Sequence, residues 1–321
     1  MSKRTTGKKK SKTTGHQSTN RLVDWFFRPS HLIISAVFGL CLVCYPVFRH
    51  YLPSLTERPE YQLGPEQVTI TSPPRWIPPD LIQQAFQRAG FRSQESLLDE
   101  TLSERVALAF YTHPWIEDVR SVRKSYPPRL HVEVVYRVPV AMVSGVDGYY
   151  PVDRHGVLLP PGDFSVADIA RYPHIDRVSS VPLGNVGEPW GDPAVIGAAE
   201  LAAVLQQSAG EKDGQPQPVW RALGIESVLA PRSVAMDEDA EHLEYRLRTT
   251  GGTQIVWGRT PSTQHPGELS VEQKLARLTD YLAGYGAFDD AHGPYEIDIR
   301  PWHGIGRGLL AAEQRDDITR N

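Results

Sequence analysis

Cysteine is scarce in this chain of 321 residues, which contains only Cys41 and Cys44. Both lie in one apolar run, so the rest of the chain can form no disulfide and carries no thiol chemistry. That part must therefore be stable through its hydrophobic core alone, which ~250 residues allow. Cys41 and Cys44 would share one face of a helix, where packing against lipid explains them better than a redox role.

Metal-binding and catalytic motifs are also missing. No two of the 11 histidines lie closer than 11 residues, and no H-x-H, HExxH or C-x-x-C pattern occurs outside the apolar run, which argues against a zinc site. Ser121 and Lys124 match the S-x-x-K pattern of acyl-transfer enzymes, but a predicted strand sends them to opposite faces. Residues 237–241 lack the glycine of a calcium loop and are interpreted as a solvated turn. We therefore predict no catalytic or metal-binding residue, no cofactor, no small-molecule substrate and no enzymatic activity.

Acidic residues are nearly absent from the first 30 positions, which hold eight Lys or Arg and one acid. The remaining residues hold 26 basic and 37 acidic side chains. An acidic remainder argues against nucleic acid as the partner, because phosphate binding needs a basic face. The asymmetry predicts a disordered basic tail over residues 1–30 that stays in the cytoplasm, with the later residues outside it.

A long apolar run lies directly after this tail. It begins at Leu32 and ends at Phe48, and 14 of its 17 residues are apolar and none is charged. With its flanks it reaches ~20 residues, enough to cross a bilayer as a helix. Because no A-x-A cleavage site follows the run, we predict a retained transmembrane signal anchor over residues 31–52 rather than a cleaved signal peptide.

The outer region is predicted to be α+β and to contain two folded parts after a proline-rich stalk, residues 53–65. In the first part, residues 66–139, the pattern predicts a strand, two helices and two strands joined by a hairpin at residues 126–128. In the second, residues 140–303, it predicts a β-rich domain with flanking helices. Its expected elements are a hairpin turning at residues 153–156, helices at 194–207 and 272–285, a polar loop at 208–218, a hairpin around Gly251 and a last strand at 295–300. Residues 304–321 are predicted to be a flexible tail.

Two groups of motifs resemble a known family. The run HPWI and then VRKSYPPRLHVEVVYRVPVAMV, within residues 113–143, resembles the end of a POTRA domain, with the PWV–xWPxxLxVxVxExxPVA pattern of the FtsQ/DivIB bacterial cell-division proteins. IVWGR, QKLARLTDYL and YEIDIRP resemble that family's C-terminal β domain, in which a strand ending LGR leads to a Lys-containing helix and an IDLR strand. The resemblance covers roughly residues 22–303. Tyr126 departs from it, standing where the family has Trp, and the segments 208–218 and 260–270 are longer than usual.

The resemblance implies a fold of one transmembrane helix, a POTRA domain and a C-terminal β domain. It implies a non-enzymatic, single-pass scaffold of the inner membrane, enriched at the division septum, that links other divisome membrane proteins to septal peptidoglycan synthesis. The contact would be β-strand addition at the last strand, residues 295–300, which we expect to lie at a sheet edge. Alternation predicts buried isoleucines there, and it leaves open whether Asp298 and Arg300 contact a partner or form a local ion pair. The partner-binding residues predicted in this way are Ile297, Asp298, Ile299, Arg300 and Trp302.

Two other functions remain open from the sequence. A POTRA-bearing envelope chaperone for exported or outer-membrane proteins would use the same edge-strand physics, but such proteins usually carry several POTRA repeats or a barrel. A membrane-tethered hydrolase would need a pocket in which Ser, His and acid side chains or paired carboxylates converge.

Overall fold

The computed structural model describes residues 29–51, 56, 58–212, 214–231 and 242–311. The predicted acidic turn at 237–241 and residues 1–28 of the predicted basic tail lie outside the described residues. The chain divides into two compact units, Met1–Pro59 and Glu60–Asn321, and each is treated separately below.

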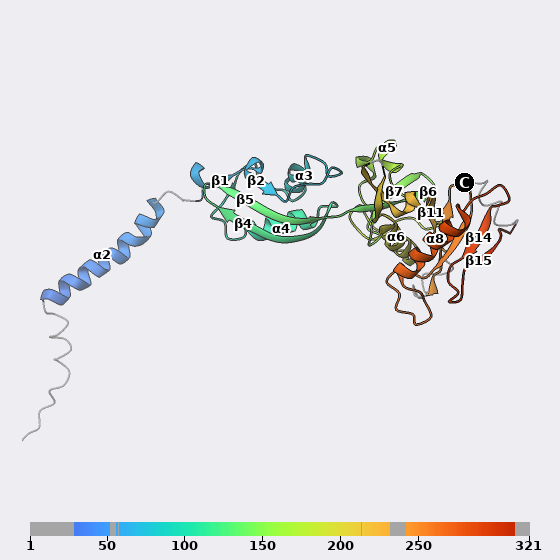
Figure 1. Cartoon of the computed structure of the whole chain (residues 1–321). Helices are drawn as coiled ribbons and strands as arrows, with labels where there is room; N and C mark the ends of the chain where they lie inside the picture. Colours follow the sequence, from blue (N-terminus) through green and yellow to red (C-terminus); the bar gives the residue numbers. More distant parts are fainter. Residues whose placement is uncertain (1–28, 52–55, 57, 213, 232–241, 312–321) are drawn as a thin grey trace, which may run out of the picture. The chain divides into compact units, whose positions relative to one another are not determined.

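The described part of the first unit is one helix, α2 (Pro29–Tyr51), which has 23 residues (Figure 1). Residues 31–51 of the segment 31–52, which was predicted to be a helix, are helical. In the part of the chain that the structure describes, no helix combines the length and the apolar character needed to cross a membrane.

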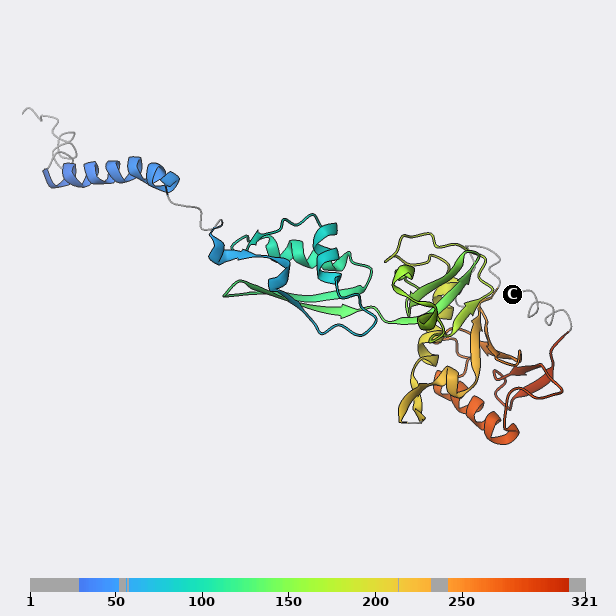
Figure 2. The same ribbon diagram turned by 90° about the horizontal axis from the view of Figure 1, so that it is seen from above.

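The second unit begins with a three-stranded sheet in the order β2-β5-β4. β2 (Val68–Ile70) pairs in parallel with β5 (Arg129–Tyr136), and β5 pairs antiparallel with β4 (Ile116–Ser125). Helices α3 (Leu81–Arg88) and α4 (Leu102–Tyr111) lie along one side of this sheet (Figures 1 and 2). The structure thus contains the predicted order of strand, helix, helix, strand and strand.

Short elements close the end of this region where the chain enters it. They are the 3₁₀ turns η2 (Pro59–Tyr61) and η3 (Pro65–Gln67) and the antiparallel pair β1 (Gln62–Leu63) and β3 (Glu95–Ser96). The sequence pattern did not predict β1 or β3, because two-residue strands are too short to show a period.

The first core forms where the apolar faces of α3, α4 and the three strands meet. Side chains on β5 alternate between buried and more exposed positions, as period 2 requires. On α4 the buried residues recur at helical spacing, and burying one side chain of the size of Phe110 contributes about 2 kcal/mol. The buried members of the first core include Leu81, Ala85, Phe86, Leu102, Val106, Phe110, Trp115, Ile116, Leu130, Val132 and Val134.

The rest of the second unit is built on a mixed eight-stranded sheet, in the order β15-β14-β13-β12-β11-β8-β6-β7. Three neighbouring pairs are parallel, namely β13 with β14, β8 with β11 and β6 with β8. The strands are β6 (Pro139–Gly145), β7 (Gly148–Asp153), β8 (His174–Asp176), β11 (Ile225–Leu229), β12 (Tyr245–Thr249), β13 (Gln254–Gly258), β14 (Tyr295–Asp298) and β15 (Gly306–Leu309).

Two helices, α6 (Pro193–Leu205) and α8 (Val271–Tyr285), supply buried side chains to the second core together with this sheet (Figure 1). Asp192 caps the start of α6 by accepting from the Ala194 N–H, and a capping box at Ser270 starts α8. The shorter elements are η4 (Pro161–Asp163), α5 (Val166–Ile169) and α7 (Val219–Ala222).

Two local predictions were wrong. The segment 208–218, predicted to be a polar loop, forms a hairpin of β9 (Ser208–Lys212) and β10 (Gln215–Pro218). Residues 306–309, placed in a flexible tail, form β15, whose two glycines and exposed side chains gave no alternating pattern.

The predicted hairpin that turns at residues 153–156 is confirmed. Val152 and Leu158 form an antiparallel bridge across it, and the Gly156 N–H donates to the Asp153 carbonyl. A further hairpin, which the sequence did not predict, turns between β6 and β7 before Gly148 (φ 138°).

Contacts cross the predicted boundary between residues 139 and 140. Leu159, which follows β7, is fully buried in the first core. The Trp115 indole N–H donates to Asp163 Oδ2 at 2.8 Å, and the Trp115 and Phe164 rings lie 5.9 Å apart. The segment 159–164 therefore completes the first core, although it belongs to the sequence of the second part.

The free energy of unfolding should depend on pH through His113, a residue buried beside the first core. It is almost fully buried, and burial, with a smaller contribution from the Arg88 charge, lowers the pKa of His113 from 6.5 to about 4. Below pH 6.5 the unfolded chain binds a proton that the folded chain does not, so the stabilisation is complete above pH 6.5 and is lost as pH falls toward 4. We expect this histidine alone to lower the free energy of unfolding by about 3 kcal/mol over that range.

The test is urea unfolding followed by tryptophan fluorescence across this pH range. His113→Gln keeps a hydrogen-bonding side chain but cannot titrate, so it should flatten the pH dependence. His292→Gln, at an exposed position, is the matched control and should keep the wild-type slope. Equal slopes in all three proteins would contradict the assignment.

Candidate functional site

The strand predicted to be a free edge is an interior strand, so that prediction was wrong. β14 pairs in parallel with β13 on one side and antiparallel with β15 on the other. The chain turns back after Pro301, and β15 takes up the backbone groups that we expected a partner to bind. Residues 295–298 are therefore hydrogen-bonded on both sides within their own sheet.

The five predicted partner-binding side chains are divided between core and surface. Ile297 and Ile299 are fully buried in the second core. Asp298 and Arg300 form the local ion pair, at 2.9 Å, and Arg300 also binds Glu244 at 2.6 Å. Trp302 is 57% exposed, and its indole N–H donates to the Gly267 carbonyl at 3.3 Å.

One arginine of α8 holds the turn between β14 and β15. The Arg277 guanidinium donates to the carbonyls of Ile299 (2.6 Å), Pro301 (2.5 Å) and Trp302 (3.0 Å). Five N–H donors in one plane let a single guanidinium satisfy several carbonyls of one turn. Arg277 thus sets where β15 begins, a role that the sequence pattern did not reveal.

A buried lysine lies at the start of α8. The Lys274 ammonium is 2.5 Å from Glu268 Oε1 and 4.9 Å from the centre of the Trp257 ring. Burial lowers the pKa of Lys274, and the hydrogen bond to Glu268 opposes this change. Glu268 also accepts from the Arg259 backbone N–H, so this pair joins the end of β13 to α8. The motif resemblance noted a Lys-containing helix here but gave no sign that the lysine is buried.

β15 lies next to β14 and forms one open edge of the eight-stranded sheet. The Leu310 N–H donates to the Pro294 carbonyl, and alternation then directs the N–H groups of Arg307 and Leu309 away from β14. All four residues of β15 are exposed, and Leu309 is 65% exposed. This edge therefore presents backbone donors and acceptors beside an apolar side chain.

Aromatic side chains support the same edge from the side of α8. The Arg307 guanidinium lies 3.9 Å from the centre of the Tyr295 ring and 5.0 Å from that of Tyr285. It also pairs with Asp290 at 2.8 Å, and the Tyr295 hydroxyl donates to the same carboxylate at 2.7 Å. That hydroxyl is the largest cause of the lowered pKa of Asp290. These contacts hold Arg307 in place while leaving Tyr285 and Leu309 exposed.

Two other sheet edges, β4 and β7, are less suited to pairing. β4 has two register shifts against β5 and exposes Arg120 and Arg123, and both features obstruct edge-to-edge pairing. The edge of β7 is partly occupied, because the Leu159 N–H donates to the Pro151 carbonyl. β15 pairs with β14 without a register shift, and it has no such covering segment among the described residues.

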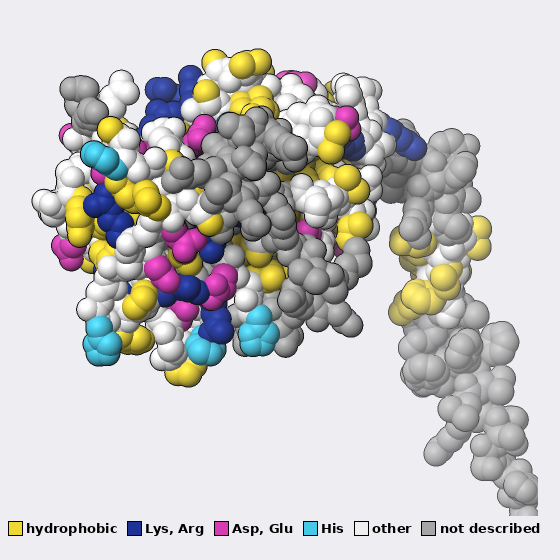
Figure 3. All heavy atoms as spheres, turned by 90° about the vertical axis from the view of Figure 1, so that its right-hand side faces the viewer, with side chains coloured by type: hydrophobic (Ala, Val, Ile, Leu, Met, Phe, Trp, Pro, Cys, Tyr) yellow, Lys and Arg dark blue, Asp and Glu magenta, His cyan; other side chains and the backbone are white. Residues whose placement is uncertain are grey.

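Charged side chains on the face seen in Figure 3 are mixed, with acidic and basic groups side by side. The eight-stranded sheet also carries mixed charges: Arg246 on β12 binds Glu296 on β14 at 2.5 Å across β13, and Arg248 on β12 binds Asp176 on β8 at 2.5 Å across β11. Such a face does not offer the continuous basic surface that phosphate binding needs.

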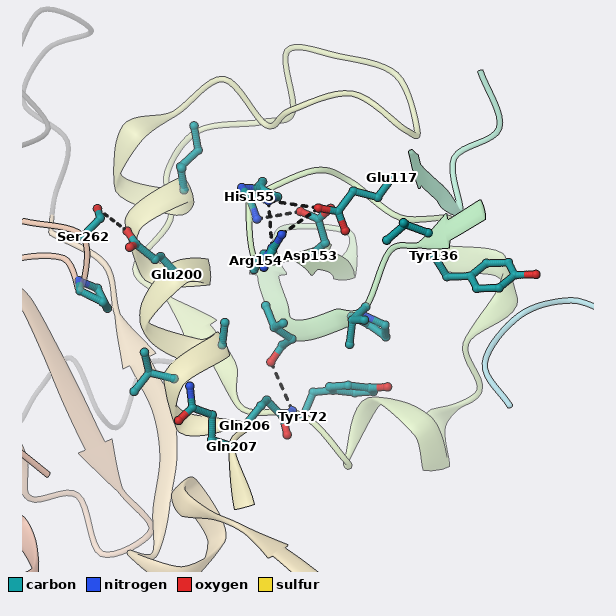
Figure 4. A pocket seen from close by; sticks show the side chains of 18 of the residues that line it. Glu117, Tyr136, Asp153, Arg154, His155, Tyr172, Glu200, Gln206, Gln207 and Ser262 are labelled. Carbon is teal, nitrogen blue, oxygen red and sulfur yellow. Dashed lines mark hydrogen bonds and ion pairs between the residues drawn. The ribbon is translucent and has the colours of Figure 1, made fainter. Parts of the chain in front are cut away.

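A pocket of about 1180 Å³ lies beside α6 (Figure 4). His155 Nε2 accepts from Arg154 at 2.9 Å, and Arg154 also donates to Glu117 at 2.9 Å. Ser262, the lining serine, donates to Glu200 at 2.9 Å. The serine and the histidine are thus bound to different partners, and this arrangement does not assemble the relay of a hydrolase. Among the described residues, no group of three or more His, Cys, Asp or Glu could hold a metal ion.

No model of a known protein family matches the chain. The chain is 26% identical, over 201 residues, to the cell division protein FtsQ of Anaeromyxobacter sp. (strain K), and this match covers 62% of the chain. It spans 56% of the length of that protein. The similarity supports a distant relationship to FtsQ/DivIB-like proteins, in agreement with the motif resemblance.

Breaking the buried Lys274–Glu268 pair should destabilise the fold, because Glu268→Gln leaves the Lys274 ammonium without its counter-charge. We expect the free energy of unfolding to fall by about 3–5 kcal/mol. Adding Lys274→Met removes the uncompensated charge and should recover most of this loss. Urea unfolding of the wild type, both single variants and the double variant measures the coupling, and additive effects would contradict it.

Charge reversal at Arg300 should lower the free energy of unfolding, because Arg300 pairs with Asp298 and Glu244. Arg300→Glu places a third acid beside Asp298 and Glu244, and we expect a loss of about 1–2 kcal/mol, against less than about 1 kcal/mol for Arg300→Gln. Urea unfolding followed by circular dichroism measures both. Equal unfolding midpoints for Arg300→Glu and the wild type would show that the ion pairs of Arg300 do not contribute to the free energy of unfolding.

Proposed function

We propose that this protein is a non-enzymatic scaffold of bacterial cell division, attached to the inner membrane by the run from Leu32 to Phe48. Its basic first 30 residues lie in the cytoplasm and the unit that starts at Glu60 lies outside it. The proposal is supported by the similarity to FtsQ, by the order of the parts along the chain and by the charge asymmetry across the apolar run.

The contact we propose is β-strand addition at β15 rather than at β14. The observation that carries it is the regular open edge with outward N–H groups at Arg307 and Leu309. Leu309 lies opposite Tyr295, so its side chain is on the same face of the sheet as the second core. A partner strand there would continue the sheet and cover Leu309 and Tyr285.

The occupant we propose is an extended segment of another divisome membrane protein, through which the scaffold reaches the septal peptidoglycan synthesis machinery. Main-chain hydrogen bonds would supply affinity, and an apolar side chain packed against Leu309 would supply specificity. A short segment suffices, because β15 has only four residues.

The test is the position of the full chain, fused to a fluorescent protein, in growing cells of its own organism. Leu309→Pro removes one outward donor, and an edge strand tolerates proline where its N–H faces solvent. We expect the wild type at the division site and an at least about tenfold lower enrichment there for the proline variant, since a lost hydrogen bond and a distorted edge together cost more than 1.4 kcal/mol.

Leu309→Ala is the matched control, because it removes the side chain but keeps the N–H. It should retain most of the enrichment. An even envelope signal for the wild type would contradict the division function and favour a chaperone. Wild-type enrichment of Leu309→Pro, with unchanged circular dichroism, would retain the division function and contradict pairing at β15.

A further inference from the structure

An apolar tip lies at the end of the three-stranded sheet where the chain enters the second unit. It surrounds a shallow depression of about 460 Å³. Its residues come from three separate segments, namely the turn before β1, the loop after β3 and the β4–β5 turn. The stalk-side tip, as we call it, consists of Tyr61, Leu97, Leu98, Lys124, Ser125 and Tyr126.

Large apolar side chains are exposed at this tip without a packing reason. Tyr126 is 70% exposed and Leu98 is 42% exposed. The Tyr126 ring is 6.2 Å from the Tyr61 ring, which covers only part of it. A stable monomer gains nothing from holding a tyrosine and a leucine in water, so such a patch indicates a contact.

The backbone beneath the tip is well fixed. The Leu97 N–H donates to the Tyr61 carbonyl at 2.8 Å, and the Lys124 ammonium donates to the Asp99 carbonyl. Arg105 binds Glu95 and Asp99 at 3.2 and 3.1 Å, which offsets part of the charge of these two acids. The tip is therefore a preformed apolar surface.

The position of the tip in the chain, close to the apolar run, indicates which surface it can reach. Only eight residues separate Tyr51, the last residue of α2, from Glu60. Eight residues can span at most about 30 Å. If the apolar run is held in a bilayer, this short tether keeps Tyr61 near the headgroups, where a high effective concentration makes a weak contact sufficient.

The chemistry of the tip fits the same occupant. Tyrosine is enriched at membrane–water interfaces because its ring is apolar and its hydroxyl is polar. Arg129, at an exposed position, can extend its stem along the apolar layer and keep its charge among the headgroups. The paired strands β4 and β5 extend away from the tip, because the ten residues of β4 cover about 33 Å.

We propose that the stalk-side tip docks on the lipid surface, with Tyr126 and Leu98 in the headgroup layer. This rests on the proposed membrane attachment and adds a second, peripheral contact to it. It would fix the direction in which β4 and β5 extend away from the membrane.

The test uses the full chain in nanodiscs of phosphatidylcholine, with and without phosphatidylglycerol, that carry a nitroxide lipid quencher near the headgroups to report on the tip or, in separate samples, in the middle of the acyl chains to report on the anchor. Ser125→Cys, in a Cys41→Ala, Cys44→Ala background, places a fluorophore at the tip. Val146→Cys, fully exposed in the β6–β7 turn, is the distant control. The native Cys41, labelled alone, reports on the anchor.

We expect strong quenching at Cys41, and several-fold stronger quenching at position 125 than at position 146. Leu98→Asp should lower the quenching at 125 to the level of the control. Leu108→Asp, the same change at an exposed position on α4, should leave it unchanged. A gain in quenching with phosphatidylglycerol would assign the added attraction to Arg129.

The failures of the two proposals are distinguishable. Quenching at Cys41 without quenching at 125 would overturn tip docking and retain the anchor. No quenching at either position would overturn both. Quenching at 125 that survives Leu98→Asp would show that the fluorophore itself seeks the lipid. If the label at position 125 becomes buried in detergent as the protein concentration rises, the tip binds a second copy of the chain and not the lipid surface.

Discussion

An open β-sheet has to end, and its last strand leaves one row of backbone N–H and C=O groups without a partner in the sheet. This constraint decides where the molecule can accept another chain. β14 cannot do so, because β15 satisfies its outer row. The Arg277 guanidinium holds the turn that makes β15 possible, and Arg307 supports β15 from the side. One strand of four residues thus moves the free edge, and with it the proposed partner site, away from the most recognisable sequence motif.

Charge is used here to stabilise contacts between neighbouring elements. The Lys274–Glu268 pair ties α8 to the end of β13, and the Arg246–Glu296 pair connects two strands of the same sheet. In both pairs the basic group faces an acid of this chain. The exposed apolar side chains lie at separate places on the second unit, and they include Leu309, Tyr285 and Tyr126.

The α+β fold could be predicted in large part from the sequence. The alternation of Leu130, Val132 and Val134 and the helical spacing around Leu278 are properties of the sequence itself. The candidate site was predicted less well. β15 has two glycines and no apolar alternation, so it forms through backbone pairing that no periodicity reports. Burial of Lys274 also depends on contacts between distant segments, with Glu268 before α8 and Trp257 on β13, and a local pattern carries no such information.

The insertion of Leu159 into the first core has a consequence for synthesis. A chain that is made from its N-terminus presents α3, α4, β4 and β5 before residues 159–164. Until then Trp115 has neither Asp163 nor Phe164 beside it. The first three-stranded sheet can therefore begin to form early but reaches its final packing only after part of the next sheet has been made. A truncation placed at the apparent boundary would leave a hole in the first core, and the order of folding events is coupled to the order of residues in the chain.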